Sequence, residues 1–117
     1  GTLAERLRRG ETLDGFGHPL YPDRDPRAAL VLDLLPKSKE LTFARKLAES
    51  VESVLGEKPN LDFALEAVEA ALDLPHGSAL TLFAIGRTIG WIAHAIEQYA
   101  QDAIIRPRAK YVGPKPT

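Results

Sequence analysis

Apolar positions recur along the chain at the three- and four-residue steps of an α-helix, and no segment alternates as a half-buried strand does. The clearest pattern covers residues 42–55, where one face is apolar, the other is charged, and Gly56 follows as a stop. Shorter helices are expected over residues 2–9, 28–35 and 63–72. The predicted fold class is therefore all-α.

A long helix is expected from Ser78, the predicted N-cap, to about Gln101, and it is apolar on most of its circumference. Gly86 and Gly90 form a small face on which another backbone could pack. Such a length of apolar helix raises the question of a membrane span, but a lipid-facing Arg87 near its middle would be costly. The pattern favours a buried helix of a soluble protein. The other helices of this short chain can hardly surround it, so further partners are expected.

Composition excludes several classes of function. The 117 residues are enough for one domain, and 15 basic against 16 acidic residues leave no net field to attract nucleic acid or an anionic membrane. Without cysteine there are no disulfides or thiolate metal sites, no His/Asp/Glu cluster has metal-ligand spacing, and no signal peptide is apparent. Because the chain starts at Gly1 and contains no methionine, we expect a processed chain or a piece of something longer.

One irregular stretch, residues 15–27, concentrates the chemistry. Its thirteen positions hold two glycines, three prolines, one histidine and two arginines, and the prolines exclude a helix. His18 is either an ordinary loop histidine or a hydrogen-bond donor to a carbonyl oxygen at which charge develops. Arg27 follows Asp25-Pro26, which fixes the backbone before it, and a planar guanidinium suits a carboxylate.

Other polar residues have two interpretations each. Asp62 precedes a helix and is either its N-cap or a general base that needs burial. Arg87, in an apolar helix, must pair with an internal acid or with an anionic ligand. His76 is expected in an exposed turn, and His94 as a packed, hydrogen-bonded residue of the long helix. Together these residues suit an acidic small molecule with a carbonyl group, and they name no reaction.

Four segments, in order, resemble the citrate synthase family. The first is Gly-Phe-Gly-His followed by Tyr21 and Asp-Pro-Arg-Ala, and the second is Pro-Asn-Leu-Asp-Phe at 59–63. The third is the helix over residues 83–98, and the fourth is the tail over residues 105–113. The resemblance covers nearly the whole chain from Gly15 to Pro114.

This resemblance implies a role for each matching residue. His18 would polarise the carbonyl of oxaloacetate, and Asp62 would take a methyl proton from acetyl-CoA to give the attacking enol. The other residues with implied roles bind substrates: Arg27 and Arg87 on the oxaloacetate carboxylates with Phe83 nearby, Arg106 reaching into the other subunit of a homodimer, and Phe16, Gly17 and Pro19 along the CoA adenine. No metal and no covalently bound cofactor is implied.

The resemblance also implies an incomplete enzyme. Residues 1–77 would be the small, mobile domain, and residues 78–117 the last helix and tail of the large domain. The family's other catalytic histidine lies upstream and has no counterpart here, so the chain alone is expected to be an inactive fragment of a cytoplasmic acyltransferase. It would act on oxaloacetate and acetyl-CoA, or another short acyl-CoA, without nucleic acid or membrane.

Two departures from the usual family pattern leave alternatives open. Ala64-Leu65-Glu66 stands where a tyrosine-serine-glycine step is typical, and Pro19 and Pro22 replace residues that are often basic. These features resemble a divergent, citryl-CoA lyase-type branch. A non-catalytic helical module for binding or oligomerisation, retaining the fold, is the second alternative.

Overall fold

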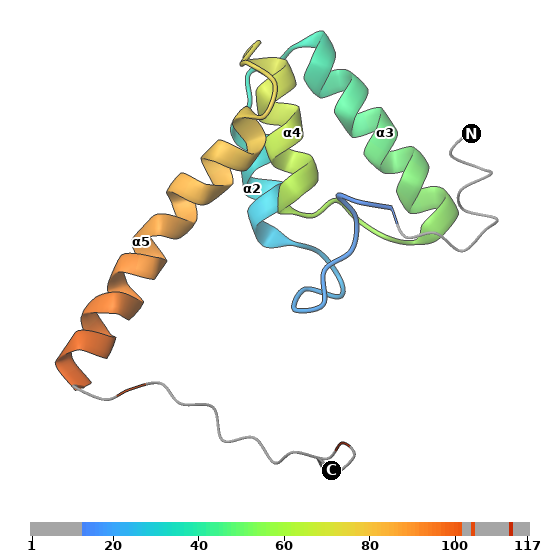
Figure 1. Ribbon diagram of the computed structural model, residues 1–117. Helices are drawn as coiled ribbons and strands as arrows, with labels where there is room; N and C mark the ends of the chain where they lie inside the picture. The colour runs from blue at the N-terminus through green and yellow to red at the C-terminus, as the bar shows by residue number, and fades with distance from the viewer. Residues whose placement is uncertain (1–12, 102–103, 105–112, 114–117) are drawn as a thin grey trace. The chain divides into compact units, whose positions relative to one another are not determined.

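The structure, a computed structural model, describes residues 13–101, 104 and 113. Within them the helices are, in chain order, α2 (Pro26–Leu34), α3 (Lys39–Leu55), α4 (Leu61–Ala71) and α5 (Ser78–Gln101) (Figure 1). In this part of the chain the only β-type pairing is an isolated antiparallel bridge between Phe16 and Pro59. The all-α prediction is confirmed. The helix predicted over residues 2–9 and the tail with Arg106 lie outside the described residues.

Each of the first three helices begins two or three residues before its predicted start, because a capping side chain sits ahead of the first buried position. Asp25 caps α2, with Pro26 in the first turn, and Ser38 caps α3 by accepting from the Leu41 N–H. Asn60 caps α4. At the other end of α3, Gly56 has φ +72° and donates its N–H to the Glu52 carbonyl, as its predicted role as a stop requires.

The core is built from small side chains. Helix α4 packs against both α2 and α3, and alanine at the contacts allows close approach of the helices. The core cluster consists of Ala28, Leu32, Leu41, Ala44, Ala64 and Ala67, with Val31, Leu35 and Phe63 packed against it. Several large side chains of the predicted apolar pattern, Leu30, Leu34, Val54 and Leu72, are instead exposed. The pattern thus located the helices and the buried face of α3, which carries Ala44, Ala48 and Val51, but not the buried faces of α2 and α4.

The start of α5 differs from the prediction that Ser78 is its N-cap. Ser78 is the first helical residue, and its hydroxyl donates to the Pro75 carbonyl. The buried N–H of Ala79 is satisfied by Glu69, whose carboxylate reaches across from α4 at 3.0 Å. A negatively charged acceptor at a helix N-terminus interacts favourably with the positive end of the helix dipole. This interaction explains why a carboxylate is tolerated at this nearly buried position.

By its internal contacts the chain divides into two units, Gly1–Ile85 and Gly86–Thr117, and most of α5 belongs to the second. Its apolar side chains face solvent in this chain: Ile89 is 75% exposed and Ile96 is 62% exposed. His94 is also exposed and lies 3.5 Å from the Glu97 carboxylate, so the prediction of a packed histidine is wrong. Among the described residues, α5 is the one helix long and apolar enough to cross a membrane, and this criterion alone does not separate such a span from a soluble core helix.

Ala64 provides a test of the close α4 packing, because its side chain is completely buried. We expect Ala64→Leu to lower the free energy of unfolding by about 1–3 kcal/mol through overpacking. Ala70→Leu is the matched control, because Ala70 lies on the same helix and is exposed. Urea unfolding followed by circular dichroism measures both, and equal stabilities of the two variants would contradict this description of the core.

Candidate functional site

The loop that begins at Leu13 is attached to the segment before α4 by three backbone or amide hydrogen bonds. The Asn60 N–H donates to the Gly15 carbonyl (2.9 Å), and the Gly17 N–H donates to the Lys58 carbonyl (2.9 Å). The Asn60 side-chain amide donates to the Gly17 carbonyl (3.0 Å), while its oxygen accepts the first N–H groups of α4. One side chain therefore caps a helix and fixes the loop upon it.

A glycine is required where this loop meets α4. Gly15 has φ +88°, and a Cβ there would lie 3.2 Å from the Cβ of Phe63. The close approach lets the Phe16 ring pack on the Phe63 ring, with centroids 5.0 Å apart. The backbone leading to His18 is thus held against α4 by both polar and aromatic contacts.

His18 is oriented by its own loop. Its Nδ1 accepts the N–H of Leu20 at 3.1 Å, and its carbonyl accepts the N–H of Tyr21. In the neutral ring, an Nδ1 that accepts a backbone proton leaves the proton on Nε2. The half-buried His18 therefore presents Nε2–H as a hydrogen-bond donor, with the Tyr21 ring 5.0 Å away on one side.

Arg27 is fixed by Asp25, a residue that is only 3% exposed. Nε and Nη2 of the guanidinium donate to the two carboxylate oxygens at 3.0 and 2.8 Å. The same carboxylate accepts the backbone N–H of Arg27 and, at 3.1 Å, the backbone N–H of Leu61 at the start of α4. The Tyr21 ring lies under the guanidinium, 5.0 Å from its carbon.

The charges of this pair reinforce each other. The side-chain hydrogen bond from Arg27 lowers the pKa of Asp25, against an opposing contribution from burial, and the Leu61 N–H lowers it further. The same hydrogen bond raises the pKa of Arg27, and the nearby negative charge of Asp62 adds to this increase. The pair stays ionised at neutral pH, and the guanidinium, whose side chain is 41% exposed, keeps edge area for a ligand.

Asp62 lies in the first turn of α4 and is exposed, so it is not the N-cap, and it is not buried as a general base would require. Asn60 is the cap because its backbone is extended while that of Asp62 is already helical. Within the first unit, Asp62 and Phe83 both line an open cavity of about 430 Å³ between α4 and the beginning of α5. Two residues of the predicted set thus share one depression.

The remaining predicted residues differ in how much the structure says of them. The N–H groups of Phe16 and Gly17 are both used within the protein, and Pro19 is exposed, so a ligand along this stretch would meet carbonyl oxygens and side-chain faces. Arg87 is exposed and forms no ion pair with any residue in the described ranges. The Arg87 guanidinium lies over Gly90, where a Cβ would be 2.8 Å from Nη1. This side chain therefore covers the part of the predicted small face at Gly90. Arg106 lies outside the described residues.

Sequence reasoning missed three supporting residues: Asp25, Asn60 and Tyr21. Asp-Pro and Pro-Asn before helical patterns are capping signals, and attention to them could have found the first two. No pattern in the sequence signals that Tyr21 would lie beside both His18 and Arg27. In the part of the chain that is described, no group of three or more His, Asp or Glu side chains is placed to hold a metal ion.

The citrate synthase C-terminal domain family matches residues 1–108 of this chain. The chain belongs to the citrate synthase family. It is 37% identical over 123 residues to a citrate synthase of Haloferax volcanii and 40% identical over 115 residues to one of Saccharolobus solfataricus. It is 33% identical over 122 residues to 2-methylcitrate synthase 1 of Corynebacterium glutamicum. These alignments cover 97%, 88% and 95% of this chain but only 32%, 30% and 31% of the relatives. The chain therefore spans about a third of the length of the curated relatives that it matches. The citrate synthase family is a family of transferases.

The Asp25 carboxylate provides a test of the loop. We expect Asp25→Asn to lower the free energy of unfolding at neutral pH by about 1–3 kcal/mol, because a charged acceptor of four hydrogen bonds is lost. Asp23→Asn is the control, because Asp23 is exposed in the same loop. Since the pKa of Asp25 is lowered in the folded state, its stabilisation is complete above the ordinary carboxyl value of 3.8 and is lost as the pH falls through the lower folded value.

Urea unfolding from neutral pH down to about pH 2.5 measures this dependence. The stability difference between wild type and Asp25→Asn should narrow at the acidic end of the range. A difference that stays constant with pH would show that the charge of Asp25 does not stabilise the fold.

Proposed function

We propose that this chain is the C-terminal part of a citrate synthase-like acyltransferase that condenses acetyl-CoA, or another short acyl-CoA, with oxaloacetate. The observation that carries the proposal is the joint fixation of His18 and Arg27 around Tyr21. One residue presents Nε2–H and the other a guanidinium held in place by Asp25. A 2-oxo dicarboxylate needs both a donor to its carbonyl oxygen and cations at its carboxylates.

In the proposed reaction His18 donates its Nε2–H to the oxaloacetate carbonyl oxygen, which makes the carbonyl carbon electrophilic and stabilises the developing alkoxide. Arg27 holds one carboxylate, and Arg87 and Arg106 supply further cationic contacts, Arg106 to the site of the other subunit. Asp62 removes a proton from the acyl methyl group, and the resulting enol attacks the carbonyl carbon to form the new C–C bond. Water then cleaves the thioester and releases CoA.

The exposure of Asp62 in this chain supports the view that a second domain must cover it before it can act as a base. A carboxylate in water is a weak base, and burial would raise its pKa toward the working pH. We infer that residues 1–77 act as the small domain and that a large domain, to which residues 78–117 belong, covers Asp62 when substrates bind. That large domain also supplies the second catalytic histidine that the family resemblance implies. A cytoplasmic homodimer is the proposed assembly.

The test is the release of CoA thiol from acetyl-CoA in the presence and absence of oxaloacetate. We expect none from the 117-residue chain alone. We expect oxaloacetate-dependent release from a chimera in which this chain replaces the equivalent C-terminal third of the S. solfataricus relative. His18→Ala in the chimera should lower kcat about 10²–10³-fold, and Asp62→Asn about 10²–10⁴-fold.

His76→Ala is the matched control for the histidine, because the His76 side chain is fully exposed and its contact is with Glu69. A folded chimera without turnover, or a His18→Ala chimera as active as the His76→Ala control, would overturn the proposal. Turnover by the isolated chain would show instead that no further domain is needed.

The exposed apolar face of α5 gives a separate prediction about association. We expect the isolated chain to form dimers or larger species, because leaving several isoleucines in water costs more than burying them between copies. Ile89→Asp with Ile96→Asp should shift the chain toward monomer in light scattering. Glu97→Ala, which replaces an exposed polar residue of the same helix, should leave the association unchanged. A wild-type chain that stays monomeric at high concentration would contradict this prediction.

A further inference from the structure

The cavity between α4 and the beginning of α5 is built from two helix faces of the first unit. Its volume is about 430 Å³, and its lining residues are Asp62, Leu65 and Glu66 from α4 and Ala79, Leu80 and Phe83 from α5. Residues three or four positions apart lie on one side of a helix, so each set projects into the same space. Four of these six side chains are apolar, and the two carboxylates both come from α4.

A hydrogen bond across the junction of α4 and α5 holds the two walls of this cavity together. The Glu69 carboxylate on α4 accepts the N–H of Ala79, in the first turn of α5, at 3.0 Å. Ala79 is buried and itself lines the cavity. The cavity is therefore a feature of the first unit alone, with its two walls fixed by a charged acceptor.

Asp62 connects the cavity with the proposed chemistry. Its negative charge contributes to the raised pKa of Arg27, so the two groups are near each other, and Asp62 also lines the cavity. A base must lie within hydrogen-bond reach of the carbon from which it removes a proton. Any further carbons of the acyl chain are attached to that carbon and therefore begin beside Asp62. The next side chain on the same side of α4 is Leu65.

Resting on the function proposed above, we propose that Leu65 and Leu80 bind the alkyl chain of the acyl group and make the site selective for saturated acyl groups longer than acetyl. Leu65 is half-buried and Leu80 is 73% exposed, so both have apolar area that an alkyl chain would cover. Leu65 also belongs to the segment that departs from the usual tyrosine-serine-glycine step, and it makes this wall apolar.

The size of the cavity suits such a chain. A methylene group is similar in size to a water molecule, which occupies about 30 Å³ in the liquid, so the cavity has room for several of them. A longer chain changes only the substituent on the carbon from which Asp62 removes the proton. The remaining steps are those of the proposed reaction.

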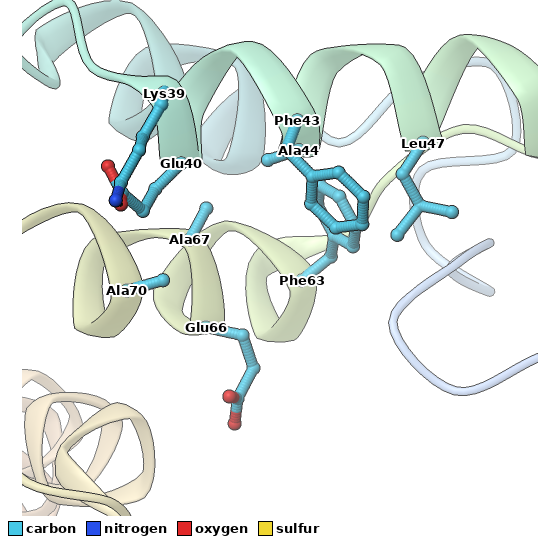
Figure 2. A pocket seen from close by; sticks show the side chains of 9 residues that line it. All are labelled: Lys39, Glu40, Phe43, Ala44, Leu47, Phe63, Glu66, Ala67 and Ala70. Carbon is cyan, nitrogen blue, oxygen red and sulfur yellow. The ribbon is translucent and has the colours of Figure 1, made fainter.

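Glu66 determines which chain ends the cavity accepts. Figure 2 views the neighbouring groove between α3 and α4 and shows the Glu66 side chain extending away from α3. Glu66 lines both that groove and the cavity, and it forms no ion pair with any residue that the structure describes. This carboxylate repels a second negative charge, so an acyl chain that ends in a carboxylate is disfavoured against an alkyl chain of the same length.

The acyl-CoA selectivity of the chimera with the S. solfataricus relative tests the inference at a fixed concentration of oxaloacetate. We expect kcat/KM with butyryl-CoA to exceed that with acetyl-CoA about tenfold, as the burial of two methylene groups predicts. Leu65→Ser should lower this butyryl-to-acetyl ratio about fivefold, because an apolar wall is lost. Leu65→Trp should lower it at least as much by filling the cavity. Leu72→Ser is the matched control and should leave the ratio unchanged, because Leu72 is an exposed leucine at the C-cap of α4 outside the cavity.

Succinyl-CoA tests the role of Glu66, because its acyl group has as many carbons as that of butyryl-CoA but ends in a carboxylate. We expect the wild-type chimera to prefer butyryl-CoA. Glu66→Gln should lower this preference about two- to threefold, as the removal of one exposed charge predicts. Glu49→Gln, at an exposed position of α3 outside the cavity, should leave it unchanged.

Equilibrium binding separates this inference from the proposed function. Titration calorimetry with acetyl-CoA and butyryl-CoA measures Kd on the same folded variants without turnover, and the same order of ratios is expected. Butyryl-CoA that binds the wild-type chimera no better than acetyl-CoA, or equal ratios for Leu65→Ser and Leu72→Ser, would overturn the inference. Oxaloacetate-dependent turnover of acetyl-CoA in either case leaves the proposed function standing.

Discussion

The described part of the site depends on the hydrogen bonds that the Asp25 carboxylate accepts. Its two oxygens bind the Arg27 guanidinium, cap α2 and hold the first N–H of α4 at Leu61. A nearly buried carboxylate without such partners would be strongly destabilising, whereas four donors make it favourable. The arginine is thereby fixed relative to both helices without any contact to a ligand.

Asn60 complements Asp25 from the other side of the loop. Its side-chain oxygen caps α4 and its side-chain nitrogen binds the Gly17 carbonyl, so the helix that carries Asp62 and the loop that carries His18 are tied by one residue. The His18 ring is oriented within the loop, because its Nδ1 accepts the N–H of Leu20. In the neutral ring this hydrogen bond leaves the proton on Nε2. Preorganisation of this kind is what electrostatic catalysis requires, since donors that are already oriented need no rearrangement as charge develops.

The sequence predicted the four described helices and the loop that carries the chemistry, because proline, glycine and helical periodicity are local signals. It predicted the buried face of α3 but not those of α2 and α4. Alanines such as Ala64 and Ala67 form the core, and their burial depends on which helix lies opposite, which no local pattern records. Glu69 was missed as the cap of α5 for the same reason: its partner, the Ala79 N–H, is ten residues away across a turn. The sequence predicted those site residues that belong to a recognisable motif. It missed Asp25 and Asn60 as supporting residues, because each one hydrogen-bonds several segments at once.

The two compact units also differ in how far the chain alone prepares them for a ligand. His18 and Arg27 are fixed by hydrogen bonds within the first unit, from their own loop and from the start of α4. Arg87 instead lies along its own exposed helix over Gly90, without an ion pair among the described residues. Holding a long flexible side chain in one geometry costs rotamer entropy that must be met at the moment of binding, whereas Asp25 has already met that cost for Arg27. Under the proposed function, a dicarboxylate should therefore bind the isolated chain weakly, because of the arginines proposed to hold it Arg27 is already fixed and Arg87 is not.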